Sequence, residues 1–122
     1  MARILIIDDS MIIREMLLEL LGDMGHDVQA ATQGEDGISR ALKDDFDLVI
    51  CDLHLPTKNG LQVFQAVHEV KPDLMFMFTD SLPDELGKLA RETTGQAYLR
   101  KPFDIYQLRE KLESLLQSIK TE

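Results

Sequence analysis

The stretch Leu48-Val49-Ile50-Cys51-Asp52 contains four consecutive apolar residues followed by an aspartate. A second run of the same kind, Ile4-Leu5-Ile6-Ile7, is followed by Asp8 and Asp9. Short runs that are apolar throughout are typical of parallel strands buried on both faces. Three further segments have the length and composition of strands, at residues 28–31, 74–78 and 97–99. Together the five segments predict a parallel β-sheet.

The segments between these strands carry apolar residues at helical spacing. They cover residues 12–24, 34–43 and 60–70, and two more helices begin near Pro83 and at Asp104. Pro83 suits the first position of a helix, and Asp84 and Glu85 suit the positive end of its dipole. Gln107 lies three residues after Asp104, which is the spacing of a capping box.

Strict alternation of strands and helices predicts an α/β protein with helices on both faces of the sheet. Because crossovers between parallel strands are right-handed, few windings are open to five strands. We expect the doubly wound order 2-1-3-4-5.

Length and charge narrow the range of functions that the chain could have. The chain has 122 residues, enough for a single domain over residues 1–122, and its 22 acidic and 13 basic residues give a net charge of -9. This charge would repel a nucleic-acid backbone, and no apolar run approaches the ~20 residues of a membrane span. The single cysteine, Cys51, allows no internal disulfide and fits a buried thiol. Only four apolar residues precede Asp8, so we expect no signal peptide and a cytoplasmic domain without direct nucleic-acid or membrane partners.

Polar residues follow four of the predicted strands. Asp8 and Asp9 follow the first strand, Asp52 the third, Thr79 the fourth and Lys101 the fifth. In doubly wound sheets, ligands bind at the carboxyl ends of the strands, where the winding reverses. Crowded carboxylates repel one another, and a bound cation relieves the repulsion. An open site of two or three carboxylates suits Mg²⁺, with Mn²⁺ as the alternative ion.

The same residue types favour phosphoryl transfer, because they combine a carboxylate nucleophile, a metal site, an ammonium group and a hydroxyl. Asp52 is the best candidate for the nucleophile, since it stands alone at the end of a central strand, while Asp8 and Asp9 are paired. For any one of these aspartates, the alternative reading is a cap on the helix that follows.

In order along the chain, these motifs resemble the receiver domain of bacterial two-component response regulators. The resemblance rests on Asp8-Asp9, on the pattern D-x-x-x-P-x-x-x-G from Asp52 to Gly60, on Thr79, and on Lys101-Pro102-Phe103. It covers essentially the whole chain and implies a flavodoxin-like, CheY-like fold. It leaves open whether the domain stands alone or is part of a longer regulator.

The resemblance implies that Asp52 accepts a phosphoryl group from a phosphohistidine on a sensor histidine kinase or a histidine phosphotransfer protein. Asp9, Asp52 and the backbone carbonyl of His54 would bind Mg²⁺ directly, and Asp8 would act through a metal-bound water. Lys101, next to a cis bond to Pro102, would pair with the phosphoryl oxygens.

The resemblance also implies a conformational switch, in which the Thr79 hydroxyl moves toward the phosphoryl group and Tyr98 turns inward. The readout surface would be the fourth helix, the fifth strand and the fifth helix, with Tyr98, Arg100 and Tyr106. It would contact a downstream protein or a second copy of the chain. Exposed Met11, Ile12 and Phe103 are the predicted contacts for the phosphodonor.

Asp80 departs from the family pattern, because a small residue usually follows the switch hydroxyl. It would slow phosphodonor entry, so that Asp80→Ala speeds phosphorylation, or alter the lifetime of the phosphate. The alternative is that Asp80 points to solvent and caps the fourth helix. The imidazole of His54 reads as a loop side chain that could also influence hydrolysis of the phosphate. Ser81 and Pro102 are further expected modulators.

We therefore expect a signalling switch that catalyses only its own phosphorylation and dephosphorylation and is otherwise not an enzyme. One alternative is a receiver-like scaffold that is never phosphorylated. Another is a Mg²⁺-dependent aspartyl phosphatase, which would require an acid two residues after the nucleophile, where His54 stands.

Overall fold

The sheet is parallel and has the predicted order. The computed structural model describes residues 1–82 and 84–120. Its five strands are ordered β2-β1-β3-β4-β5. Their bounds are β1 Arg3–Ile7, β2 Asp27–Ala31, β3 Leu48–Asp52, β4 Met75–Asp80 and β5 Ala97–Arg100. The predicted sheet order is therefore confirmed, and the predicted strand bounds hold to within two residues.

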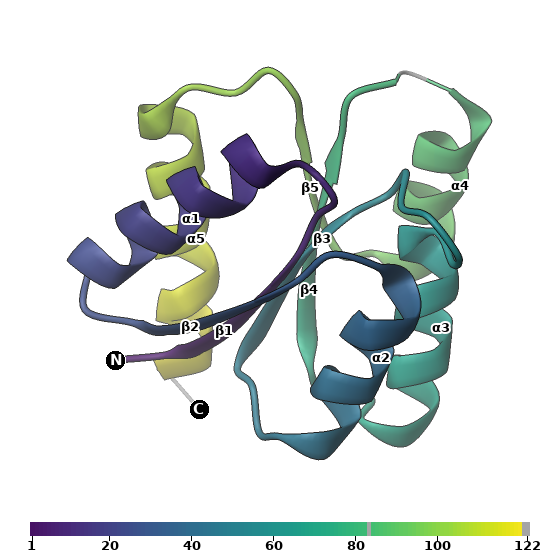
Figure 1. The fold of residues 1–122 in the computed structure, drawn as a ribbon, viewed down its shortest axis with the longest axis horizontal. Coiled ribbons are helices and arrows are strands. Elements are labelled where there is room, and N and C mark those ends of the chain that lie inside the picture. Colours follow the sequence, from purple (N-terminus) through teal and green to yellow (C-terminus); the bar gives the residue numbers. More distant parts are fainter. Residues whose placement is uncertain (83, 121–122) are drawn as a thin grey trace.

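Five helices cover the two faces of this sheet. They are α1 Met11–Asp23, α2 Gly34–Lys43, α3 Gly60–Val70, α4 Glu85–Thr94 and α5 Ile105–Lys120. Helices α1 and α5 lie on one face, and α2, α3 and α4 lie on the other (Figure 1). Each face has its own apolar core, because alternate residues of the central strands point to opposite sides. None of the helices formed by the described residues has the length and apolar character that a membrane span requires.

Side-chain caps fix where several helices begin. Asp104 and Gln107 form the predicted capping box, with hydrogen bonds of 3.0 and 2.8 Å. Asp84 caps α4 by accepting a hydrogen bond from the Gly87 backbone N–H, so the helix begins at Glu85 and Asp84 lies just before its first turn. The predicted role of Pro83 falls outside the residues that the structure describes.

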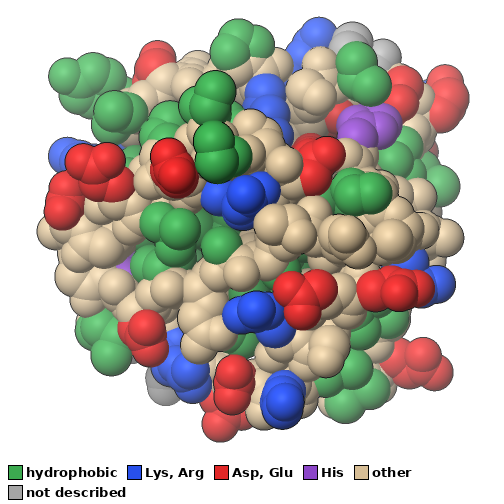
Figure 2. All heavy atoms as spheres, viewed as in Figure 1, with side chains coloured by type: hydrophobic (Ala, Val, Ile, Leu, Met, Phe, Trp, Pro, Cys, Tyr) green, Lys and Arg blue, Asp and Glu red, His purple; other side chains and the backbone are tan. Residues whose placement is uncertain are grey.

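Strand register brings the predicted site together. Asp52 pairs with Thr79 across β3 and β4, and Ile7, the last residue of β1, pairs with Cys51. Gly60 presses against the end of β3, where a Cβ atom would lie only 2.5 Å from the Asp52 carbonyl oxygen. A glycine is therefore needed for α3 to begin this close to the sheet. Over the face that Figure 2 shows, acidic and basic side chains are interspersed with apolar ones.

Candidate functional site

An acidic pocket lies at the carboxyl ends of β1 and β3. Asp8, Asp9 and Asp52 each offer a carboxylate oxygen, and these oxygens lie within 4.8 Å of one another. Asp8 and Asp52 are buried and Asp9 is exposed, so the pocket opens to solvent on one side. An all-oxygen donor set with an open side fits Mg²⁺, which keeps several of its waters.

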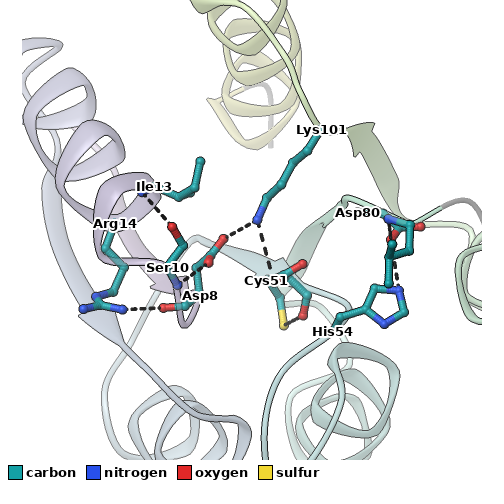
Figure 3. A network of polar contacts seen from close by, with 10 residues as sticks. Asp8, Ser10, Ile13, Arg14, Cys51, His54, Asp80 and Lys101 are labelled. Carbon is teal, nitrogen blue, oxygen red and sulfur yellow. Dashed lines mark hydrogen bonds and ion pairs between the residues drawn. The ribbon is translucent and has the colours of Figure 1, made fainter.

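Lys101 closes the pocket from the side of β5. Its Nζ lies 2.8 Å from Asp8 Oδ2 and 3.7 Å from Asp52 Oδ2, as Figure 3 shows for the Asp8 contact. The Lys101–Pro102 peptide bond is cis, as the resemblance implied. The three aspartates and the lysine predicted from strand ends are therefore brought into one site.

The start of α1 holds Asp8 in place. Asp8 Oδ1 accepts a hydrogen bond of 2.9 Å from the Ser10 backbone N–H, and the Arg14 side chain donates one of 3.0 Å to the Asp8 carbonyl oxygen (Figure 3). Ser10 also caps α1 by accepting from the Ile13 backbone N–H. The carboxylate is thus oriented by the helix that follows it. Ser10 and Arg14 were not among the predicted site residues, although a serine directly after Asp9 is a capping signal.

Burial dominates the electrostatics of Asp52. It raises the pKa of the Asp52 carboxyl to about 6, against the opposing effect of the Lys101 ammonium, and the nearby Asp8 charge adds to the rise. The neighbouring Cys51 is a buried core thiol, as predicted, and burial also raises its pKa. The surroundings of the Asp52 carboxylate therefore favour the binding of either a proton or a metal cation.

Two buried oxygens at the ends of β3 and β4 lack hydrogen-bond partners among the residues that the structure describes. Thr79 Oγ1 and Asp52 Oδ1 are shielded from solvent, and no described residue forms a hydrogen bond with either. Buried polar atoms are normally paired, so such atoms point to a partner that the protein chain itself does not supply. The two residues pair across β3 and β4, so both belong to the same edge of the sheet.

Asp80 is turned away from solvent into a network with Tyr98 and His54. Its side chain is 0% exposed, and its Oδ2 accepts a hydrogen bond of 2.7 Å from the Tyr98 hydroxyl. His54 Nε2 lies 3.2 Å from Asp80 Oδ1 (Figure 3). The alternative in which Asp80 points to solvent and caps α4 is therefore wrong, because Asp84 is the cap. The imidazole of His54 is likewise more than a loop side chain, since it contacts this buried carboxylate.

The surface residues agree in part with prediction. Met11 and Ile12 are exposed, at 62% and 76%, but Phe103 is half-buried because it packs against the core under α1 and α5. Tyr106 is 81% exposed, whereas Tyr98 is half-buried with its ring stacked under Arg91. Ser81 is exposed, just beyond the end of β4.

Comparison with known proteins identifies the family. The sequence model of the response regulator receiver domain matches residues 4–113, so the chain belongs to this family. Transcriptional regulatory protein HprR of Escherichia coli (strain K12) is 32% identical over 117 residues, which are 94% of this chain and 52% of that protein. The family is one of signal-transduction domains and is not a classical enzyme family.

Solved structures agree with this assignment. Chemotaxis protein CheY4 of Vibrio cholerae has a TM-score of 0.84 and 28% identity, covering 94% of this chain and 98% of that chain. A CheY-like receiver domain protein of Methanospirillum hungatei JF-1 has a TM-score of 0.91 and 25% identity, covering 100% and 99% of the two chains. The fold is thus the CheY-like, flavodoxin-like fold. The chain spans about half the length of the curated relatives it matches.

Proposed function

We propose that this chain is a phosphorelay receiver domain whose phosphoacceptor is Asp52. The observation that carries the proposal is the buried Asp52 carboxylate, which has one oxygen without a partner and lies between two further aspartates and Lys101. The donor would be a phosphohistidine on a histidine kinase or a histidine phosphotransfer protein.

In this reaction an Asp52 oxygen attacks phosphorus, the P–N bond to the donor histidine breaks, and the bond electrons leave with the imidazole nitrogen, which takes up a proton. Bound Mg²⁺, held by Asp9, Asp52 and the His54 carbonyl with Asp8 behind a water, would neutralise charge on the phosphoryl oxygens. Lys101 would supply a second positive charge, since its ammonium group lies 2.8 Å from Asp8 and 3.7 Å from Asp52.

The phosphoryl group would also bias the conformation of the domain. Its oxygens are strong hydrogen-bond acceptors, and the Thr79 hydroxyl is a buried donor with no partner among the described residues. A bond that forms only in the phosphorylated state shifts the equilibrium between two conformations. Tyr98 and the surface formed by α4, β5 and α5 would report this shift to a downstream protein or to a second copy of the chain.

The proposal is tested with a small phosphoramidate donor, which presents the same P–N bond as phosphohistidine. With Mg²⁺, intact-mass measurement should show one added phosphoryl group, and chelation of the metal should prevent its addition. Asp52→Asn should abolish uptake, whereas Asp73→Asn, at an exposed turn remote from the pocket, should leave it unchanged.

Other outcomes would point to a different acceptor residue or a different function. Uptake that persists in Asp52→Asn would overturn the assignment of the acceptor. No uptake by the wild-type protein would favour an unphosphorylated scaffold. Sustained hydrolysis of unrelated phosphate esters would favour an aspartyl phosphatase.

A further inference from the structure

A second cluster of metal-binding side chains lies beside the acidic pocket and shares no residue's side chain with it. His54 lies in the loop after β3 and Asp80 at the end of β4. Asp84 is the residue that caps α4. Each offers one ligand atom, and the three atoms lie within 4.8 Å of one another. Figure 3 shows the His54 ring and the Asp80 carboxylate facing each other.

The distances in this cluster fit a shared ion. His54 Nε2 lies 3.2 Å from Asp80 Oδ1 and 3.4 Å from Asp84 Oδ2. Two ligand atoms at ordinary Zn–N and Zn–O lengths in a tetrahedral site are separated by about 3.3 Å. Nε2 is also shielded from solvent, yet it lacks the alignment of a hydrogen bond with any described residue, although both carboxylates are within reach. Ligand atoms that surround one metal ion lie close together in this way but do not point hydrogen bonds at one another.

Both carboxylates are oriented by hydrogen bonds, and each presents one oxygen to the imidazole of His54. Asp84 uses Oδ1 to cap α4 through the Gly87 backbone N–H, which leaves Oδ2 facing the imidazole. Asp80 Oδ2 accepts from the Tyr98 hydroxyl, and its Oδ1, which faces the imidazole, also accepts from the Leu82 backbone N–H at 3.1 Å. Ligating carboxylates in metalloproteins are typically oriented by such hydrogen bonds.

We propose that His54, Asp80 and Asp84 form a binding site for a divalent transition-metal ion, for which Zn²⁺ is the representative. One imidazole nitrogen and two carboxylate oxygens favour ions of this class over Mg²⁺, whereas the oxygen-only acidic pocket has the opposite preference. The side chains of His54 and Asp84 are 26% and 45% exposed, so an ion can enter and keep water in its remaining position. The competing explanation is that His54 only pairs with the two carboxylates and that the cluster holds no metal.

The site is tested by titrating tag-free protein with Zn²⁺ while recording the ¹⁵N resonances of the histidine rings. The Asp9→Asn/Asp52→Asn double variant removes two carboxylates from the acidic pocket, so that binding there does not obscure the result. We expect the ¹⁵N resonance of His54 Nε2 to shift, and the shift to be complete at one equivalent of Zn²⁺. His68, exposed on α3 and stacked on Phe64, is the internal control and should not shift over that range.

A matched variant separates the metal site from the ion pair. Asp84→Asn removes the charged ligand but keeps an oxygen that can cap α4, because asparagine caps helices about as well as aspartate. It should weaken Zn²⁺ binding more than about tenfold and leave the fold unchanged. In excess Mg²⁺, which would occupy the acidic pocket, the wild-type protein should show the same shift of the His54 resonance. This measurement replaces the one on the double variant if that variant folds poorly. If His54 and His68 respond to the same Zn²⁺ concentrations, or if Asp84→Asn binds as the parent does, the cluster is an ion pair only.

Discussion

Replacing Asp52 by asparagine is expected to make the metal-free protein more stable. In the folded chain this carboxylate is buried, and the neighbouring aspartates outnumber the single ammonium group of Lys101. Asparagine has nearly the same shape as the protonated acid and carries no charge. The substitution therefore removes an unfavourable charge while preserving the packing.

The size of the effect follows from the pKa of Asp52. Folding raises it from 3.8 to about 6. Each pKa unit corresponds to about 1.4 kcal/mol, so a shift of this size sets a ceiling near 3 kcal/mol. Because solvent reaches the open side of the pocket, we expect Asp52→Asn to raise the free energy of unfolding by about 1 to 3 kcal/mol at pH 7.5.

The gain should depend on pH in a defined direction. A raised pKa means that the folded protein holds the Asp52 proton more tightly than the unfolded chain does. As the pH rises from about 4 to about 6, the unfolded chain releases this proton first, and the stability of the wild type falls relative to the variant. The difference between the two proteins should therefore be near zero at pH 3.5 and complete above pH 7.

Urea denaturation followed by circular dichroism, in EDTA, measures this difference at each pH. Asp73→Asn at an exposed turn serves as the control and should change stability by less than about 0.5 kcal/mol. A variant no more stable than wild type at pH 7.5 would refute the reasoning. A gain of equal size at pH 3.5 and pH 7.5 would also refute it, because the gain would then not arise from charge.

Four further substitutions have expected outcomes. Gly87→Ala should destabilise the protein by about 1 to 3 kcal/mol in thermal or urea unfolding, because its Cβ would collide with Asp80 Oδ2. Gly22→Ala, where no atom lies within 4 Å of the added Cβ, should instead stabilise it by up to about 1 kcal/mol, and a loss at both sites would contradict the packing argument. Lys101→Met should cost about 2 to 4 kcal/mol in the same assay, since it leaves Asp8 buried without its cation; an unchanged midpoint would count against this pairing. Asp80→Ala should speed phosphorylation by the small donor, and equal labelling rates would show that this carboxylate does not hinder entry.

The fold and the acidic pocket were predictable because both depend on patterns along single segments. Runs such as Ile4–Ile7 are long enough for a strand and too short for a helix, and the polar residue after each run marks the edge where ligands bind. Right-handed crossovers then leave few sheet orders. These constraints are sufficient to place Asp8, Asp52 and Lys101 together before any coordinates are known.

The direction of the Asp80 side chain was harder to predict, because an aspartate at a strand end usually reaches water. A signal was nevertheless present. In the register of β4 and β5, Phe78 pairs with Tyr98 and Asp80 pairs with Arg100, so Asp80 and Tyr98 are diagonal neighbours on one face. The position of the His54 ring could not be predicted in this way, since His54 lies in the loop between β3 and α3, outside any regular strand or helix pattern.

The contact between Lys101 and Asp8 joins two residues 93 positions apart in the chain. During synthesis, the aspartates therefore leave the ribosome long before the ammonium group that balances them. A nascent chain that has completed β1 and β3 still lacks the last member of the pocket until β5 has joined the sheet. The negative charges of Asp8 and Asp52 are thus balanced only once the last strand of the sheet is in place.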